Sequence, residues 1–215
     1  MYDILVILGA YLIGAIPFGF LIPKLFGVSD VRKVGSGNVG ATNAYRSAGP
    51  IAGILVLICD IGKGVAAVML ARFVPGTIVP PEYLLFAAGM AAILGHIFTI
   101  FLGFKGGKGV NTALGVMITI LPLESLVALV VFIIVVCITR YISLGSMLAA
   151  STLFLMTFIE WLFKLKEMPP VYIIVPFLLV LLIVFAHRSN IKRLLAGNEN
   201  RFSFHSKPKE VNENA

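Results

Sequence analysis

The sequence predicts an all-α polytopic membrane protein, and three observations lead to this fold class. Of the 215 residues, 59% are hydrophobic and only 13% are charged, a composition too apolar for a soluble domain. The apolar residues gather in runs close to the length of a membrane-spanning helix. Most of the lysine and arginine residues lie in the polar breaks between these runs, where such residues set the orientation of a membrane protein.

Seven apolar runs follow one another along the chain. No lysine or arginine precedes the first run, so the stretch from Met1 to Phe26 is predicted to be a retained span rather than a cleaved signal peptide. The runs cover about residues 3–24, 51–73, 82–103, 110–121, 123–139, 145–163 and 171–187.

The fourth and fifth runs are short and meet at Pro122. A helix of the length of the fourth run would cover only about 18 Å of the ~30 Å hydrocarbon core. The two runs therefore form either one kinked span or a short helical hairpin that turns at Pro122-Leu123-Glu124.

The basic residues favour seven crossings. With seven, thirteen lysines and arginines fall on one side of the membrane and three on the other, with Lys63 inside a span. Six crossings would put the basic C-terminal tail on the opposite face from the first two basic loops. The positive-inside rule thus predicts seven transmembrane helices with the N-terminus outside and the C-terminus in the cytoplasm.

This topology places every glycine-rich or densely polar loop on the cytoplasmic face. Residues 1–197 are predicted to form one membrane domain, and residues 198–215 a polar cytoplasmic tail that is disordered. The formal charge of +7 is spread over loops between spans, so it indicates orientation rather than binding to nucleic acid.

The segment Ser36-Gly37-Asn38-Val39-Gly40-Ala41-Thr42-Asn43-Ala44-Tyr45-Arg46 is the first candidate site. Its glycines allow the backbone to approach a ligand, its small polar side chains are hydrogen-bond donors, and its arginine supplies a planar cationic fork. Such residues suit an anion, and the position beside an apolar run predicts a phosphate handled beside lipid.

The segment Gly103-Phe104-Lys105-Gly106-Gly107-Lys108-Gly109 precedes the fourth run. Glycines there leave N–H groups at a helix start free to face an anion. The segment is not a Walker A loop, because Leu102 stands where the first glycine belongs and Gly109 where serine or threonine belongs. Phosphate binding is predicted, and ATP binding is not.

Two further polar segments end at the same membrane depth, residues 139–143 and residues 187–193. The first contributes Ser143. In the second, His187 and Asn190 are three positions apart and would share one face of a continuous helix.

Simpler explanations compete with these hypotheses. Basic residues at span ends often only set topology, and a glycine cluster can be a tight turn. His96, inside the third run, is more often a packed histidine than a catalyst. Asp60 and Lys63, three apart in the second run, are predicted to form an ion pair that fixes helix packing; the alternative is that they face the substrate site.

Acidic residues are scarce in the proposed site loops. Only Asp30 and Glu199 occur there, each at a margin, whereas a Mg²⁺ site needs at least two carboxylates. No aspartate stands five positions after any histidine, which excludes a His-x4-Asp acyltransferase. The sequence predicts no metal and no cofactor, and a cationic pocket suited to two anionic substrates.

Three of these motifs resemble those of the bacterial membrane acyl-phosphate:glycerol-3-phosphate acyltransferase family, in order and with the expected spacing. They are residues 36–43, residues 104–109 after Gly95-His96, and residues 187–191. The resemblance extends over nearly the whole chain. It implies transfer of a fatty acyl group from acyl phosphate to the 1-hydroxyl of glycerol 3-phosphate. The products would be 1-acylglycerol 3-phosphate (lysophosphatidate) and inorganic phosphate, in the first acylation of phospholipid biosynthesis.

The resemblance also implies roles for individual residues. The 36–43 loop would hold the acyl-phosphate headgroup and the developing oxyanion, the cations would neutralise the two phosphates, and the last motif would orient glycerol 3-phosphate. The residues predicted to be catalytic are Ser36, Asn38, Thr42, Lys105, His187 and Asn190. Those predicted to bind substrate are Gly37, Gly40, Asn43, Arg46, Gly106, Gly107, Lys108 and Ser143.

Two questions stay open at this stage. The proton of the attacking hydroxyl goes either to the departing phosphate, which we favour because no carboxylate is available to orient His187, or to His187 itself. A transporter of phosphate or a phosphorylated metabolite is the alternative function. The expected partners are the two substrates and the lipid bilayer of the bacterial inner membrane, with no obligate protein partner.

Overall fold

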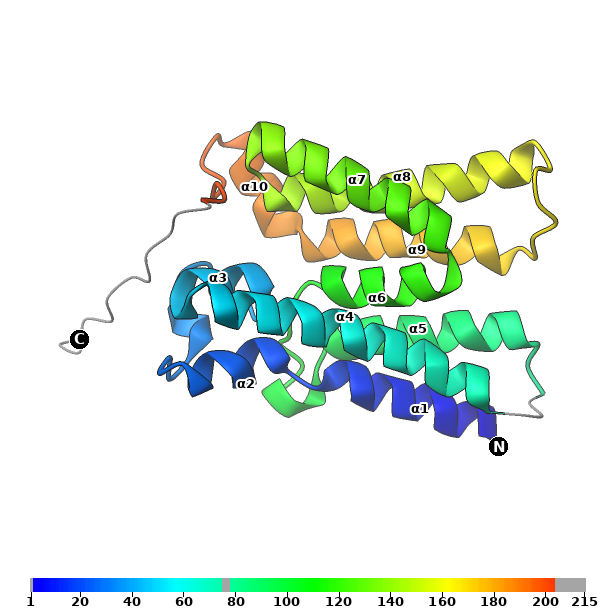
Figure 1. The fold of residues 1–215 in the computed structure, drawn as a ribbon, viewed down its shortest axis with the longest axis horizontal. Coiled ribbons are helices and arrows are strands. Elements are labelled where there is room, and N and C mark those ends of the chain that lie inside the picture. Colours follow the sequence, from blue (N-terminus) through cyan, green and yellow to red (C-terminus); the bar gives the residue numbers. More distant parts are fainter. Residues whose placement is uncertain (1, 75–77, 204–215) are drawn as a thin grey trace.

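The computed structural model describes residues 2–74 and 78–203, and within them the regular structure is helical (Figure 1). Each of the seven predicted apolar runs begins within three residues of the first residue of a helix. The elements are α1 (Tyr2–Ala15), α2 (Phe18–Leu25), η1 (Val31–Lys33), α3 (Ala41–Ala48), α4 (Pro50–Phe73), α5 (Pro81–Ile97), η2 (Ile100–Leu102), α6 (Val110–Ile120), α7 (Pro122–Thr139), α8 (Ile142–Leu162), α9 (Val171–Ala186) and α10 (Arg188–Leu195).

Proline marks the start of three of the long helices. Pro50, Pro81 and Pro122 each occupy the first turn of their helix, where the missing N–H group costs nothing and the fixed φ suits the helix. The apolar runs and the prolines together therefore define most helix boundaries.

The first apolar run is broken into α1 and α2 at Ile16-Pro17. The break interrupts the helical hydrogen bonding of this apolar run, and side chains from neighbouring segments donate to its carbonyl groups. Thr99 Oγ1 donates to the Ala15 carbonyl at 2.6 Å, and Lys63 Nζ donates to the Ile16 carbonyl at 3.0 Å. Such side-chain partners allow a broken helix within hydrocarbon.

The fourth and fifth runs form a hairpin, not one kinked span. Helix α6 ends at Ile120, Leu121 leaves the helical conformation, and α7 starts at Pro122. The two helices run in opposite directions (Figure 1). Short α6 lies at the centre of the protein, with Val116 and Met117 fully buried in the main hydrophobic core.

Glycine allows two pairs of helices to approach closely. A Cβ atom at Gly14 in α1 would collide with the Ala92 backbone of α5, and one at Gly115 in α6 would collide with the Ile61 carbonyl of α4. Small residues at such crossings allow close van der Waals packing. This packing holds helices together in lipid, where no hydrophobic driving force acts between them.

Five helical stretches in the described residues are long and apolar enough to cross a membrane, with α1 and α2 counted together, and six if α9 and α10 form one span across their 62° bend. Helix α6, with 11 residues, reaches only about 16 Å. The prediction of an all-α polytopic membrane protein is thus confirmed, whereas seven crossings and the orientation stay predictions.

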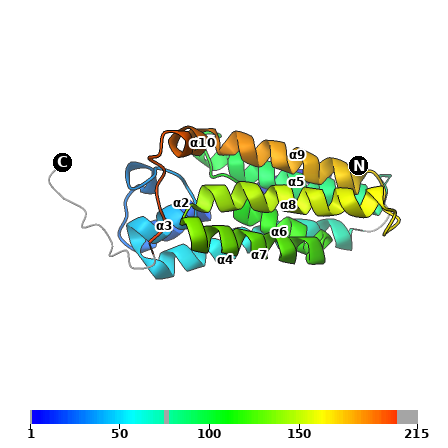
Figure 2. The same ribbon diagram turned by 90° about the horizontal axis from the view of Figure 1, so that it is seen from above.

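Polar elements gather at one end of the helix bundle. Helices α2, α3 and α10 lie together there in both views, and α1 begins at the opposite end (Figures 1 and 2). The described start of the predicted tail also folds onto this end, where Glu199 is buried. Residues 198–203 of the predicted tail are thus described in contact with this end through Glu199, and residues 204–215 lie outside the described residues.

Candidate active site

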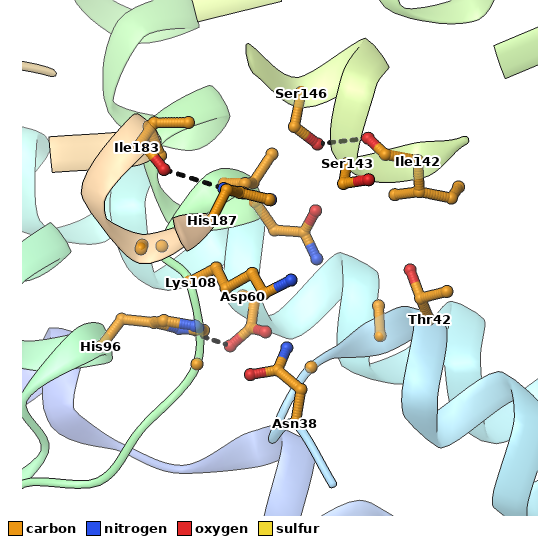
Figure 3. Close-up of a pocket in the computed structure, with 18 of the residues that line it drawn as sticks. Asn38, Thr42, Asp60, His96, Lys108, Ile142, Ser143, Ser146, Ile183 and His187 are labelled. Atoms are coloured by element: carbon orange, nitrogen blue, oxygen red, sulfur yellow. Dashed lines mark hydrogen bonds and ion pairs between the residues drawn. The ribbon is translucent and has the colours of Figure 1, made fainter. Parts of the chain in front are cut away.

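A cavity of about 1080 Å³ opens among the polar loops and continues between the helices. All four polar segments predicted from the sequence contribute to its lining. Every predicted site residue lines it: Ser36, Gly37, Asn38, Gly40, Thr42, Asn43, Arg46, Lys105, Gly106, Gly107, Lys108, Ser143, His187 and Asn190. Figure 3 shows Asn38 and Thr42 on one side, and Ser143 and His187 on the other.

Asn43 holds the first polar loop in shape. Its side-chain amide donates to the carbonyls of Val31 and Val34 at 2.9 and 3.0 Å, and its side-chain oxygen accepts from the N–H of Ser36 at 2.8 Å. Both amide hydrogens are thus occupied within the protein. Asn43, predicted to bind substrate, instead positions the loop that carries Ser36.

The start of helix α3 is available to an anion. Gly40 precedes the helix and offers no side-chain cap, so no side chain of the cap residue occupies the N–H groups of Ala41 and Thr42, whereas the N–H of Asn43 donates to the Gly40 carbonyl. Gly40, Ala41 and Thr42 all line the cavity. The helix start and the Thr42 hydroxyl together provide donors of the kind that stabilise phosphate or an oxyanion.

The glycine-rich segment folds back onto the end of α5. The N–H of Gly106 donates to the Ile97 carbonyl at 2.9 Å, and that of Gly107 donates to the His96 carbonyl at 3.1 Å. A Cβ atom at Gly106 would collide with the His96 carbonyl. The prediction that these N–H groups face an anion is wrong, because α5 occupies them; the glycines instead permit close packing that brings Lys105 and Lys108 to the cavity.

Glu199 lies at the centre of a hydrogen-bond network. One carboxylate oxygen accepts from Ser143 Oγ at 2.8 Å and from the Asn190 amide at 2.6 Å, and the other accepts from Arg193 Nε at 2.7 Å. Burial opposes ionisation of this carboxyl, but the bonds from Asn190, Arg193 and Ser143 lower its pKa below the usual range. In the sequence Glu199 stands only at the margin of the site loops, and no local signal predicts this role.

Lys108 connects the glycine-rich segment to this network. Its Nζ donates a short hydrogen bond to the side-chain oxygen of Asn190. Burial is the main reason that the pKa of Lys108 is lowered to about 8, although Glu199 raises it. At neutral pH the amine is still largely charged, so it can neutralise a phosphate.

Arg46 reaches the same mouth of the cavity from α3. Its guanidinium donates to the Arg201 carbonyl at 3.4 Å, and burial lowers its pKa without removing its charge at neutral pH. Lys105 is exposed at the mouth. The cavity mouth is therefore cationic, as predicted.

His187 lies where the chain bends from α9 into α10, and its side chain is buried. Its Nδ1 lies 2.9 Å from the Ile183 carbonyl. Because a carbonyl only accepts, the proton of the neutral ring is on Nδ1, and Nε2 carries the lone pair. His187 can therefore accept a hydrogen bond from a substrate hydroxyl.

Asp60 and Lys63 form the predicted ion pair, with 2.8 Å between Asp60 Oδ1 and Lys63 Nζ. The same carboxylate lies 3.5 Å from Nδ1 of His96, and Asp60 and His96 both line the cavity (Figure 3). Lys63 thus connects α4 to the α1–α2 break through the Ile16 carbonyl, and Asp60 faces the site. His96 is predicted from the sequence to be a packed histidine. Its contact with Asp60 joins α5 to α4, and spacing along one helix predicts only the contact between Asp60 and Lys63.

The inner part of the cavity is apolar. It extends along α6, α7 and α8 past Met117, Ala128 and Leu153 as far as Ser125. A cationic mouth above an apolar interior suits an amphiphilic molecule with an anionic head and a hydrocarbon tail.

Comparison with known proteins agrees with this chemistry. The family described as glycerol-3-phosphate acyltransferase matches residues 4–197. The glycerol-3-phosphate acyltransferase of Geotalea daltonii is 47% identical over 200 residues, which cover 93% of this chain and 97% of that one. Glycerol-3-phosphate acyltransferase 2 of Bacillus anthracis is 45% identical over 199 residues, which cover 93% and 98%.

Solved structures give the same result. The crystal structure of PlsY (YgiH), an integral membrane glycerol 3-phosphate acyltransferase, in its glycerol 3-phosphate form has a TM-score of 0.84 at 39% identity, covering 94% of this chain and 96% of that one. Its lysophosphatidic acid form has a TM-score of 0.82 at 37% identity, with the same coverage. This chain therefore belongs to the glycerol-3-phosphate acyltransferase family.

Proposed function

We propose that this acyltransferase moves a fatty acyl group from acyl phosphate to the 1-hydroxyl of sn-glycerol 3-phosphate. The products are 1-acylglycerol 3-phosphate and inorganic phosphate, and the step is the first acylation of phospholipid biosynthesis. One observation carries the proposal: a single cavity joins a cationic mouth containing Arg46, Lys105 and Lys108 to an apolar interior. The alternative of a phosphate transporter has no support from the family to which the chain belongs.

The acyl phosphate headgroup would lie against the first polar loop. Ser36, Asn38 and Thr42, with the start of α3, would donate to its phosphate and to the oxyanion that forms at the carbonyl. The acyl chain would extend into the apolar interior. The three cations at the mouth would neutralise the two phosphates.

Glycerol 3-phosphate would bind on the opposite side of the mouth. Ser143, His187 and Asn190 would orient it so that its free hydroxyl faces the acyl carbonyl carbon. Glu199 keeps Ser143 and Asn190 in position through its hydrogen bonds to both. Orientation of two bound reactants supplies much of the catalysis in such a reaction.

The chemical step needs no covalent acyl-enzyme, because phosphate is already a good leaving group. The hydroxyl oxygen attacks the acyl carbon, the bond from that carbon to the phosphate oxygen breaks, and the hydroxyl proton moves to the departing phosphate. Nε2 of His187 is the other possible acceptor. We favour the phosphate because Nδ1 of His187 contacts a backbone carbonyl rather than a carboxylate that would stabilise an imidazolium.

We further propose seven crossings in the bacterial inner membrane, with the N-terminus outside and the cavity mouth facing the cytoplasm. The basic residues of α2, α3 and α10 at one end of the bundle support this orientation. The α6–α7 hairpin supports counting α6 as a crossing, although α6 is short.

A direct assay tests the donor and the reaction. The purified protein in detergent receives labelled glycerol 3-phosphate with either palmitoyl phosphate or palmitoyl-CoA, without added metal or acyl carrier protein. Product is expected only with palmitoyl phosphate. Product with palmitoyl-CoA alone would overturn the proposed donor, and no product with either, from folded protein, would overturn the reaction and call for flux measurements in liposomes.

A further inference from the structure

We propose that Ser125 and Ala128 form the closed end of the acyl-chain compartment and thereby set the longest acyl chain that the enzyme accepts. The inference rests on the proposed function, because it assigns the apolar interior to the acyl chain of the donor. It adds a determinant of chain length, which the reaction itself does not specify.

The cavity extends far along the bundle. It is lined by Ser143 near the polar mouth and by Ser125 in the first turn of α7. Helix α7 ends near the mouth at Thr139, so Ser125 lies fourteen positions deeper, or about 21 Å at 1.5 Å per residue. This depth exceeds the ~15 Å of one hydrocarbon leaflet, enough for a long acyl chain.

The walls between the mouth and this depth are apolar, and several are small. Ala128 and Leu153 are buried in the hydrophobic core, and Ala149 and Ala150 pack against it. Met117 of α6 is fully buried beside them. Small side chains leave the space that a hydrocarbon chain occupies, so a larger side chain here would shorten the compartment.

An ion cluster follows at the far end, with both of its carboxylates buried and Lys166 exposed. Next to Ser125 along α7, Glu124 is buried, and its carboxylate lies 2.7 Å from Lys166 Nζ. The same amine lies 3.0 Å from Glu160 of α8. The methyl end of an acyl chain cannot extend into this cluster without breaking hydrogen bonds between charged groups, and this costs free energy.

Ser125 has the properties expected at such an end. Its side chain is 1% exposed, and its hydroxyl has no hydrogen-bond partner among the described residues. It therefore stabilises the ion cluster by no direct bond. What it supplies is small volume at the bottom of the cavity.

The test compares acyl-chain profiles. Initial rates are measured for the unmodified enzyme and for Ser125→Phe with lauroyl, myristoyl, palmitoyl and stearoyl phosphates. The variant is expected to keep kcat/KM with lauroyl phosphate and to lose about tenfold or more with the longest donors, since one misplaced methylene changes discrimination by at least that factor. The KM for glycerol 3-phosphate should stay unchanged.

Two controls keep the test decisive. Leu126→Phe adds bulk at a neighbouring position that faces outward, with 50% of the side chain exposed, and should leave the profile unchanged. Ala128→Val repeats the test with a smaller added volume, so the inference does not depend on Ser125→Phe folding.

The outcomes are distinguishable. Parallel profiles for the unmodified enzyme and both cavity variants would overturn the inference and leave the reaction intact. An equal shift in Leu126→Phe would overturn it as well. Absence of activity with every acyl phosphate in the folded, unmodified enzyme would overturn the proposed function, and this inference with it.

Discussion

The carboxylate of Glu199 accepts a hydrogen bond from the side-chain amide of Asn190 at 2.6 Å. The bond ties the chain that follows α10 back to the helix itself, after a turn at Gly197 with φ of 71°. Glu199 also accepts from Ser143 at the start of α8. One carboxylate therefore fixes two polar side chains that come from different helices and line the same cavity.

Replacing Glu199 by Gln should weaken the binding of glycerol 3-phosphate. The NH2 group of glutamine would face at least one of the groups that now donate to Glu199. At least one hydrogen bond of the network would therefore be lost. The loss of a charge-assisted bond, about 1.5–3 kcal/mol, corresponds to roughly a 10- to 100-fold fall in kcat/KM. Glu167→Gln, at an exposed position, is the matched control; an equal loss there, or none in Glu199→Gln, would contradict the assignment.

The affinity for glycerol 3-phosphate should fall as the pH rises through about 8, the lowered pKa of Lys108. Below this pH the amine carries the charge that attracts phosphate, and above it the charge is lost. Bound phosphate favours the charged amine and shifts the transition upward. The second ionisation of a phosphate, near pH 6, is complete in this range. The measurement is KM against pH.

The Lys108→Arg variant provides the comparison for this pH profile. Arginine stays charged throughout the range, so its KM should be independent of pH even if its value differs. A rise of KM through about pH 8 in both proteins would assign the titration to another group.

His187→Ala should keep substantial turnover while losing affinity for glycerol 3-phosphate, if the departing phosphate takes the proton. The Nδ1 contact with the Ile183 carbonyl leaves only Nε2 to meet the substrate, which suits a hydrogen-bond acceptor that orients the hydroxyl. Saturation kinetics separate kcat from KM. Abolished turnover with unchanged affinity would instead identify His187 as the general base.

The membrane fold could be predicted from the sequence to a large extent, because hydropathy and the prolines at 50, 81 and 122 are local signals. The residues that line the cavity were predicted as well, but the contacts that position them were not. Asn43 and Glu199 act through contacts across turns whose shape the sequence does not specify. Similarly, the N–H groups of Gly106 and Gly107 were expected to face an anion, and the neighbouring end of α5 accepts them instead.

Removing the charge of Arg46 or of Lys105 at the cavity mouth should reduce phosphate binding. Arg46→Ala and Lys105→Ala each delete a charge-assisted contact worth about 1.5–3 kcal/mol, so affinity or rate should fall roughly 10- to 100-fold. Arg46→Lys tests whether bidentate geometry matters in addition to charge. Near-normal kinetics in both alanine variants would remove these residues from the phosphate site.

Breaking the Asp60–Lys63 ion pair should destabilise the folded protein more than replacing both partners. Both side chains are buried, and Lys63 also donates to the carbonyl at the α1–α2 break. Asp60→Asn leaves the lysine buried without its counter-charge. The cost of such a change is about 3–5 kcal/mol, or roughly 6–20 °C in the unfolding midpoint of a chain of this size.

The double variant Asp60→Asn/Lys63→Met should lose less stability than the sum of the losses in the two single variants. Both charges are then removed, so no unpaired charge remains in the interior. Lys24→Met, at an exposed position on α2, controls for the loss of a lysine as such. The midpoints are compared by thermal unfolding in one detergent. Additive losses in the double variant would show that Asp60 and Lys63 act independently and would contradict the pairing.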